Sequence, residues 1–95
     1  MFEWDDRKRR ANIAKHVIDF VQAARIFEGP VVESPDLRRD YGEQRFGAYG
    51  EVGGDVFYVI YTWRGDKRRL ISARKASTYE SETYYAKIDA TDDEG

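Results

Sequence analysis

Cysteine is absent from this 95-residue chain, and histidine occurs only once. Without cysteine the chain forms no disulfides, thiol nucleophiles or iron–sulfur clusters, and one histidine is too few for the usual zinc sites. No apolar run approaches the roughly 20 residues that cross a bilayer, and the opening residues 1–5 lack the apolar core of a signal peptide. We therefore expect a cytoplasmic protein with no membrane contact, no bound metal and no cofactor.

Aromatic residues, in contrast, are plentiful. They make up 15% of the chain within a hydrophobic share of 41%, which is enough for a packed core although 36% of residues are charged. A chain of this length is one domain. We expect that domain to occupy residues 1–88, followed by an acidic, flexible tail at residues 89–95.

Charge is unevenly distributed along the sequence. The net charge is −2, but residues 89–95 carry four acids and no base, and the bases of the remaining chain cluster at residues 7–10, 67–69 and 74–75. Such clusters attract polyanions through their local potential. The sequence pI of about 5.4 nevertheless argues against a protein that binds nucleic acid by electrostatics alone.

Helix signals lie at both ends of the chain. Asp5 is suited to cap a helix that runs to about His16, and Asp19 a second helix that ends before Gly29-Pro30. Ser77 and Glu80 have the spacing of a capping box, which predicts a last helix from there to about Ile88.

Strand patterns fill the middle and the extreme N-terminus. Residues 2–4 and 31–32 predict short strands, residues 33–43 a loop, and residues 44–52, 55–64 and 67–74 three strands joined by two-residue turns at Gly53-Gly54 and Gly65-Asp66. The predicted fold is α+β, an antiparallel meander packed by two N-terminal helices and one C-terminal helix, in the order β-α-α-β-β-β-α.

Register across these turns divides the meander into two faces. If both turns have two residues, Arg45, Thr62 and Arg69 share a row, and the same face holds Tyr49, Tyr58, Ile60, Ile71 and Ala73. The opposite, core face then holds Phe46, Ala48, Phe57, Val59, Tyr61, Trp63 and Leu70, with Ser72 and Arg74 near one end.

The first of these faces has the residue types that RNA binding needs. Arginine guanidinium groups bind phosphate oxygens bidentately, and aromatic rings stack on unpaired bases. Arg45 and Arg69 with Tyr49 and Tyr58 are therefore candidate RNA-binding residues. The alternative is that the rings support the C-terminal helix while the arginines form surface ion pairs.

Five further residues are candidates for chemistry. His16 is the only side chain with an ordinary pKa near neutrality, although it equally suits a helix C-terminus. Arg74-Lys75, next to the last helix, can hold a phosphate or form a solvated junction. Glu80 is a capping acid or a catalytic one, and Tyr84, one turn further on, packs in the core or serves chemistry.

The sequence also resembles the BrnT family of bacterial toxins. The likeness runs from Phe2 to about Tyr84 and rests on an ordered set of fragments: Phe2-Glu3-Trp4-Asp5, Asn12, Ala14-Lys15-His16, Asp19-Phe20, Ala23-Ala24-Arg25, Phe27, Asp40-Tyr41-Gly42-Glu43, Arg45, Gly50, Val52-Gly53-Gly54, Tyr61-Thr62, Arg64-Gly65, Ile71 to Ala76, Glu80 and Tyr84.

The resemblance implies a RelE-like fold and a metal-independent endoribonuclease that inhibits translation. It also implies a BrnA-type antitoxin partner, through which alone the complex would contact operator DNA. Cleavage of RNA without metal needs activation of the 2′-OH, charge stabilisation at phosphorus and a proton for the leaving oxygen. The residues expected to supply these are His16, Arg45, Arg64, Arg74, Glu80 and Tyr84 for catalysis, and Lys15, Tyr49, Tyr58, Arg69 and Lys75 for substrate binding.

Two other functions remain open at this level. The chain could be a non-catalytic module that binds an antitoxin or RNA with the same fold, or a DNA-binding regulator that acts alone. The second of these is the weaker hypothesis, because residues 19–28 contain only Arg25 as a base and make a poor recognition helix.

Overall fold

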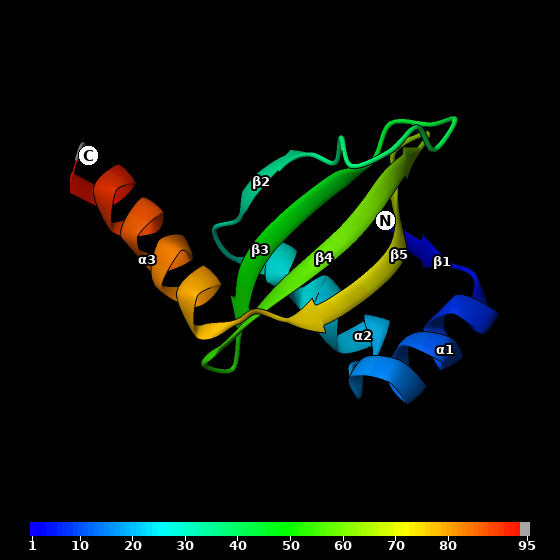
Figure 1. Ribbon diagram of the computed structural model, residues 1–95, viewed down its shortest axis with the longest axis horizontal. Coiled ribbons are helices and arrows are strands. Elements are labelled where there is room, and N and C mark those ends of the chain that lie inside the picture. Colours follow the sequence, from blue (N-terminus) through cyan, green and yellow to red (C-terminus); the bar gives the residue numbers. More distant parts are fainter. Residues whose placement is uncertain (94–95) are drawn as a thin grey trace.

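A five-stranded mixed sheet forms the centre of the protein (Figure 1). The computed structural model describes residues 1–93. The strands are β1 (Phe2–Trp4), β2 (Val32–Pro35), β3 (Phe46–Val52), β4 (Asp55–Arg64) and β5 (Lys67–Lys75), in the spatial order β1-β5-β4-β3-β2. Strands β3 to β5 form the predicted antiparallel meander, β2 pairs antiparallel with β3, and β1 adds to β5 in parallel. The α+β fold class is confirmed. The short strand predicted at residues 31–32 is β2, which runs from Val32 to Pro35 and so extends into the predicted loop; the observed order thus has one strand more than the predicted order after the first two helices.

Helices cover one face of this sheet and one of its ends. They are α1 (Asp6–His16), α2 (Phe20–Ala23), the 3-10 helix η1 (Ala24–Glu28) and α3 (Thr78–Asp93). The predicted single helix from residue 20 thus tightens into a 3-10 helix for its second half. Helix α3 continues past the expected end at Ile88 to Asp93, so the predicted tail begins as helix. Residues 94–95 of that tail lie outside the described residues.

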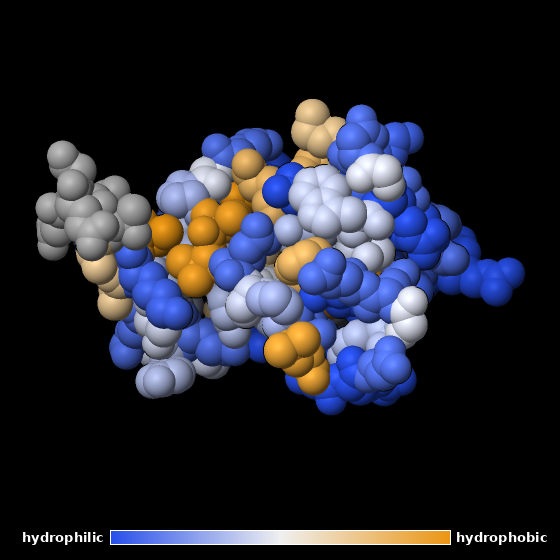
Figure 2. Space-filling view, turned by 90° about the horizontal axis from the view of Figure 1, so that it is seen from above, coloured by the Kyte–Doolittle hydropathy of each residue, from blue (hydrophilic) through white to orange (hydrophobic). Residues whose placement is uncertain are grey.

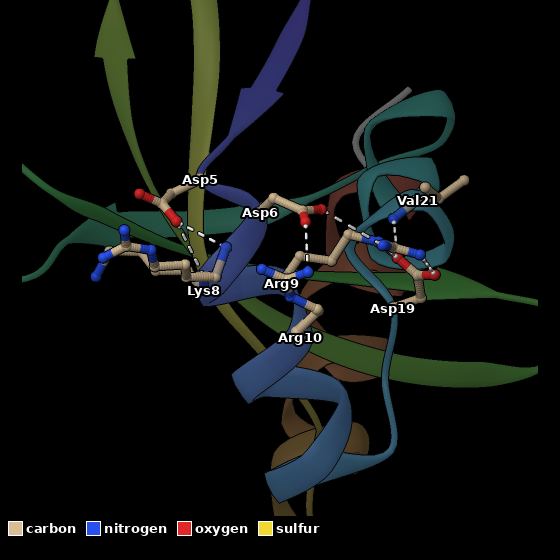
Figure 3. A network of polar contacts seen from close by, with 8 residues as sticks. Asp5, Asp6, Lys8, Arg9, Arg10, Asp19 and Val21 are labelled. Carbon is tan, nitrogen blue, oxygen red and sulfur yellow. Dashed lines mark hydrogen bonds and ion pairs between the residues drawn. The ribbon is translucent and has the colours of Figure 1, made fainter.

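Two aspartates position helix α1: Asp5 caps its first turn, and Asp19 connects it to the next helix (Figure 3). Asp5 accepts hydrogen bonds from the backbone N–H groups of Arg7 and Lys8, as the sequence predicts for a cap. Arg9 then makes two hydrogen bonds to Asp19, at 2.9 and 2.8 Å, which ties α1 to the start of α2. Part of the basic run at residues 7–10 is therefore structural.

The hydrophobic core lies between the sheet and the α2–η1 segment. Phe20, Ala23 and Ile26 are fully buried there, against the core face of β3, β4 and β5. The predicted core residues of the sheet that are buried in it are Ala48, Phe57, Val59, Tyr61 and Leu70. Gly50 permits this packing, because a Cβ at that position would collide with Ile26.

A β-bulge between β4 and β5 changes the predicted faces. From the turn, Arg64 pairs with Lys67 and Tyr61 with Leu70, as expected, but the register shifts at Ile60, which pairs with Ser72. Beyond the bulge the two faces of β5 are exchanged. Ala73 therefore lies in the core rather than on the RNA-binding face, and Arg74 leaves the core face, where simple alternation placed it.

Asn12 holds the edge of β5 beyond the end of β1. Its buried side chain donates to the carbonyl of Ala73 and accepts from the N–H of Ala73, at 2.8 and 3.0 Å, and it also donates to the carbonyl of Ile18. The amide thus replaces the missing neighbouring strand and fixes α1 beside the bulge. Among the described residues, no helix is long and apolar enough to cross a membrane.

Candidate functional site

Glu80 is the centre of a polar cluster where β5 meets α3. The predicted capping box forms: the N–H of Ser77 donates to Glu80 at 2.8 Å, and the N–H of Glu80 donates to the Ser77 hydroxyl at 3.1 Å. The same carboxylate also accepts two hydrogen bonds from Arg74, at 2.8 and 2.9 Å, and one from the hydroxyl of Tyr49 at 2.7 Å. Glu80 therefore both caps the helix and positions a cation and a phenol.

Arg74 reaches this cluster because of the β-bulge. The shifted register pairs Arg74 with Tyr58, and its guanidinium lies 4.8 Å from the centre of the Tyr58 ring. The ring of Tyr58 contacts that of Tyr49, with centroids 4.4 Å apart. The guanidinium is thus held from below by an aromatic face and from the side by a carboxylate, while the Arg74 side chain stays 38% exposed.

The contacts in this cluster keep the Glu80 carboxylate ionised and the Tyr49 hydroxyl protonated. Hydrogen bonds from Arg74 above all, and then from Ser77 and Tyr49, hold the pKa of Glu80 well below its usual range. Burial, reinforced by the hydrogen bond to Glu80, raises the pKa of Tyr49 to about 12. At neutral pH Glu80 is therefore a carboxylate and Tyr49 a hydrogen-bond donor.

A pocket of about 320 Å³ opens beside this cluster, between α3 and the strands β2 and β3. Helix α3 contacts β2 and extends past that edge of the sheet (Figure 1). The pocket is lined by Val32, Tyr49, Tyr79, Glu80, Thr83, Tyr84 and Lys87. Tyr84 anchors the helix at this place, since its side chain is buried and its hydroxyl donates to the carbonyl of Pro30 at 2.7 Å.

The other predicted cations of the sheet are paired with acids elsewhere. Glu43 binds both Arg45, at 3.1 Å, and Arg64, at 3.4 Å, and Arg45 also lies 4.1 Å from the centre of the Tyr41 ring. Arg69 is 2.5 Å from Glu3 on the neighbouring strand. Thr62 pairs with Arg69 as predicted. These contacts match the ion-pair alternative for Arg45 and Arg69.

Lys75 remains next to the cluster in the sequence. It follows Arg74 at the end of β5 and forms an exposed ion pair with Asp55, at 3.3 Å. Exposed pairs of this kind are weak and exchange readily for another anion. Lys75 is thus next to Arg74 in the sequence, but in the sheet it pairs with the core-face residue Phe57 and lies on the opposite face of β5 from the Glu80 cluster.

His16 and Lys15 lie at a different place from Glu80. Both line a shallow pocket of about 230 Å³ at the end of α1, together with Lys8, Ala11, Asn12, Ile71 and Ser72. This pocket shares no lining residue with the one beside Glu80. The structure therefore brings Arg74, Glu80, Tyr49, Tyr58 and Tyr84 together, whereas His16 and Lys15 form a separate group.

Sequence reasoning missed Tyr79, Thr83 and Lys87. They recur every four residues, which places them along one side of a helix, beside Glu80 and Tyr84. That periodicity was the available signal, but which neighbour the helix side faces depends on the angle between α3 and β2. Within residues 1–93, no three carboxylate or imidazole side chains gather as metal ligands would.

Comparison with known proteins places the chain in a family. No curated protein sequence matches the chain. A family model described as "Ribonuclease toxin, BrnT, of type II toxin-antitoxin system" matches residues 4–80, a segment that includes Arg74 and ends at Glu80. The chain therefore belongs to the BrnT family of ribonuclease toxins of type II toxin–antitoxin systems.

Proposed function

We propose that this chain is a metal-independent endoribonuclease whose active site is the cluster of Arg74, Glu80 and Tyr49, and that a BrnA-type antitoxin neutralises it. The observation that carries the proposal is the double hydrogen bond between Arg74 and Glu80, with the Tyr49 hydroxyl on the same carboxylate. The BrnT family implies an RNA target and an antitoxin, which makes RNA cleavage the chemistry to be explained.

Arg74 is the group that stabilises charge at phosphorus. Its guanidinium is held in place by Glu80 and the Tyr58 ring, yet part of it faces solvent. Fixed donors of this kind favour the extra negative charge of a pentavalent phosphate without reorganising during the reaction.

Glu80 and Tyr49 provide a route for the protons. When a phosphate binds Arg74, it competes for the guanidinium and adds negative charge, and both effects raise the pKa of Glu80. Glu80 then takes the proton of the 2′-OH as that oxygen attacks phosphorus. The bond from phosphorus to the 5′-oxygen breaks, and the Tyr49 hydroxyl protonates that oxygen. The products are a 2′,3′-cyclic phosphate and a 5′-OH.

The hydrogen bond between Tyr49 and Glu80 completes the cycle. After cleavage Tyr49 lacks a proton and Glu80 carries one, and the two oxygens are 2.7 Å apart in the free protein. Direct transfer along this contact restores both groups. Neither His16 nor Lys15 takes part in these steps. Arg45, Arg64 and Arg69 bind the RNA strand further along the sheet when its phosphates displace Glu43 and Glu3.

The proposal is tested by exchanging the two paired side chains. Arg74→Lys loses the bidentate geometry, and Glu80→Gln keeps a capping residue while removing the base. We expect each variant to cleave single-stranded RNA about 10² to 10³ times more slowly in kcat/KM, with added chelator making no difference to the native protein. Arg10→Lys, on the exposed side of α1, is the matched control and should cleave normally.

Expression in a bacterial host gives the second readout. The native chain should arrest growth and fragment RNA, and co-expression of the partner encoded next to it should relieve both effects. Unfragmented RNA with confirmed folding and partner binding would instead identify a non-catalytic interaction module. Cleavage that persists undiminished in Glu80→Gln and Arg74→Lys would place the active site elsewhere.

A further inference from the structure

The pocket beside Glu80 has the character of a binding site for one flat ring. Its volume of about 320 Å³ is at the lower end of the roughly 300–1,000 Å³ that small-molecule sites span. Its walls combine the aromatic rings of Tyr49, Tyr79 and Tyr84 with the side chain of Val32, while Glu80 and Thr83 contribute polar oxygens. This is too small for a helix of a partner protein but large enough for a single heterocycle.

Tyr79 is the residue that makes the pocket unusual. Its side chain is 77% exposed, so burial in the core does not account for a large ring at this position. In contrast, the neighbouring Tyr84 is buried and bonded to Pro30, and Tyr85 donates to Glu51 at 2.7 Å. An exposed ring at the mouth of an apolar pocket is a stacking platform, and stacking on unpaired bases is how proteins commonly hold single-stranded RNA.

The surroundings of the pocket agree with a base as its occupant. Seen from the β2 edge, hydrophobic side chains gather beside the C-terminal part of α3, and polar ones surround them (Figure 2). Val32, which lines the pocket, is a half-buried apolar residue. A nucleobase presents the same combination, with apolar faces and a polar edge.

The pocket and the proposed active site also share two residues. Glu80 and Tyr49 line the pocket, and both belong to the cluster that holds Arg74. A nucleotide whose base enters the pocket would therefore have its own phosphate, or the adjoining one, close to Arg74. Thr83 and Lys87 lie beyond residue 80, outside the segment that matches the family model.

We infer that this pocket holds one unpaired nucleobase of the RNA, stacked on Tyr79, and thereby selects which phosphodiester lies at Arg74. The inference rests on the proposed function for its substrate but concerns binding, and it is tested without cleavage. Tyr79 would act as a specificity residue: it would contribute to binding the strand and take no part in proton transfer.

The test uses a short single-stranded RNA with 2′-O-methyl riboses, which lacks the attacking hydroxyl and stays intact. 2-Aminopurine is placed at each position in turn, and at one of them its fluorescence should fall on binding, as stacking on a ring requires. Tyr79→Leu keeps an apolar side chain without a ring and should weaken binding about tenfold. Tyr79→Phe should bind as the native protein does. Tyr85→Leu, on the same helix but outside the pocket, is the matched control.

Abasic substitution completes a double-mutant cycle. Removing the base at the position that shows quenching should weaken binding by the native protein to the level of Tyr79→Leu, and the variant should lose nothing further. With cleavable RNA, Tyr79→Leu should raise KM about tenfold and leave kcat within about twofold, unlike Arg74→Lys.

Other results would overturn the inference. Equal binding of the methylated RNA by Tyr79→Leu and the native protein would do so, above all if the variant bound the antitoxin more weakly, since the pocket would then belong to that interface. Failure of the proposed function is separate: it would appear as absent cleavage by the native protein, while methylated RNA still bound through Tyr79.

Discussion

At the scale of single residues, the proposed active site depends on one carboxylate with several partners. Glu80 accepts hydrogen bonds from Arg74, Tyr49 and the N–H of Ser77. Together these hydrogen bonds hold the pKa of Glu80 well below its usual range. A group so strongly stabilised as an anion is a weak base in the free protein. Its basicity has to increase when substrate binds, which couples catalysis to occupation of Arg74 by phosphate.

This coupling predicts a characteristic pH profile. The pKa of Glu80 is lowered in the free protein, so the active carboxylate form is lost only as pH falls through that low pKa. Because kcat/KM reports the free enzyme, it should stay flat from about pH 5 to pH 9. The profile of kcat reports the complex, where phosphate raises the pKa of Glu80, and its acid limb should therefore lie at higher pH.

Steady-state cleavage of a defined oligonucleotide across this range checks the prediction. A histidine base would instead bring an acid limb in kcat/KM near pH 6.5, the ordinary value for an imidazole. His16→Ala provides the direct comparison, and we expect it to leave both profiles in place. An acid limb near neutrality that disappears in His16→Ala would contradict the role given to Glu80.

At the scale of elements, β3 is packed closely on both faces. Two of its glycines lie where any side chain would collide: a Cβ on Gly47 would meet the Tyr58 ring, and one on Gly50 would meet Ile26. The first contact faces the site and the second faces the core. A side chain added at Gly47 would therefore disturb the site, whereas one added at Gly50 would disturb the core.

Alanine at these two glycines should separate stability from activity. Both Gly47→Ala and Gly50→Ala should lower the free energy of unfolding by about 1–3 kcal/mol through overpacking. Only Gly47→Ala moves the ring beneath Arg74, so only this variant should lose a large part of its kcat under conditions where it is fully folded. Urea unfolding and cleavage rates provide the two readouts.

Gly29→Ala is the matched control, because no atom lies within 4 Å of a Cβ placed there. It should change stability and activity little. Equal losses of kcat in Gly47→Ala and Gly50→Ala would show that the support from Tyr58 is unimportant.

The elements themselves were largely predictable, because their signals are local. Asp5 and Ser77 cap helices as their types and spacing indicate, and Gly53, Gly54 and Gly65 form turns with positive φ angles. The register shift at Ile60 was not predictable, since a bulge leaves no fixed mark in the sequence. It decides on which face Arg74 lies, and so the contact between Arg74 and Glu80 could not be derived although both residues were candidates.

At the scale of the whole molecule, charge is balanced locally as well as overall. The net charge is −2, and Arg45, Arg64, Arg69 and Arg74 each contact a carboxylate. In the proposed mode of binding, RNA phosphates therefore displace these acids rather than occupy a vacant basic groove. Binding on these terms releases few counterions, because part of the cationic charge is already neutralised.

A shallow salt dependence follows from this balance. We expect the logarithm of the RNA binding constant to fall with the logarithm of salt concentration with a slope of about −1 to −2, which corresponds to roughly two or three phosphate contacts. Fluorescence anisotropy with the 2′-O-methyl RNA at several salt concentrations measures it. Glu43→Gln should steepen the slope, because it releases Arg45 and Arg64 from their shared acid.

Glu51→Gln serves as the control for loss of one negative charge, since Glu51 contacts Tyr85 rather than an arginine. An identical slope in the native protein and in Glu43→Gln would mean that these two arginines do not meet the RNA backbone.

Glu80 caps α3 and is also the proposed catalytic base, which limits the mutations that can inactivate such a toxin without unfolding it. Most substitutions of Glu80 that abolish toxicity would also remove a cap of α3. The destabilised protein would then be degraded by proteases. Glutamine is the exchange that preserves the cap while removing the proposed base. Natural relatives that have lost toxicity but still bind their antitoxin should therefore be enriched in glutamine at the position of Glu80. Comparison of genome sequences can test this expectation.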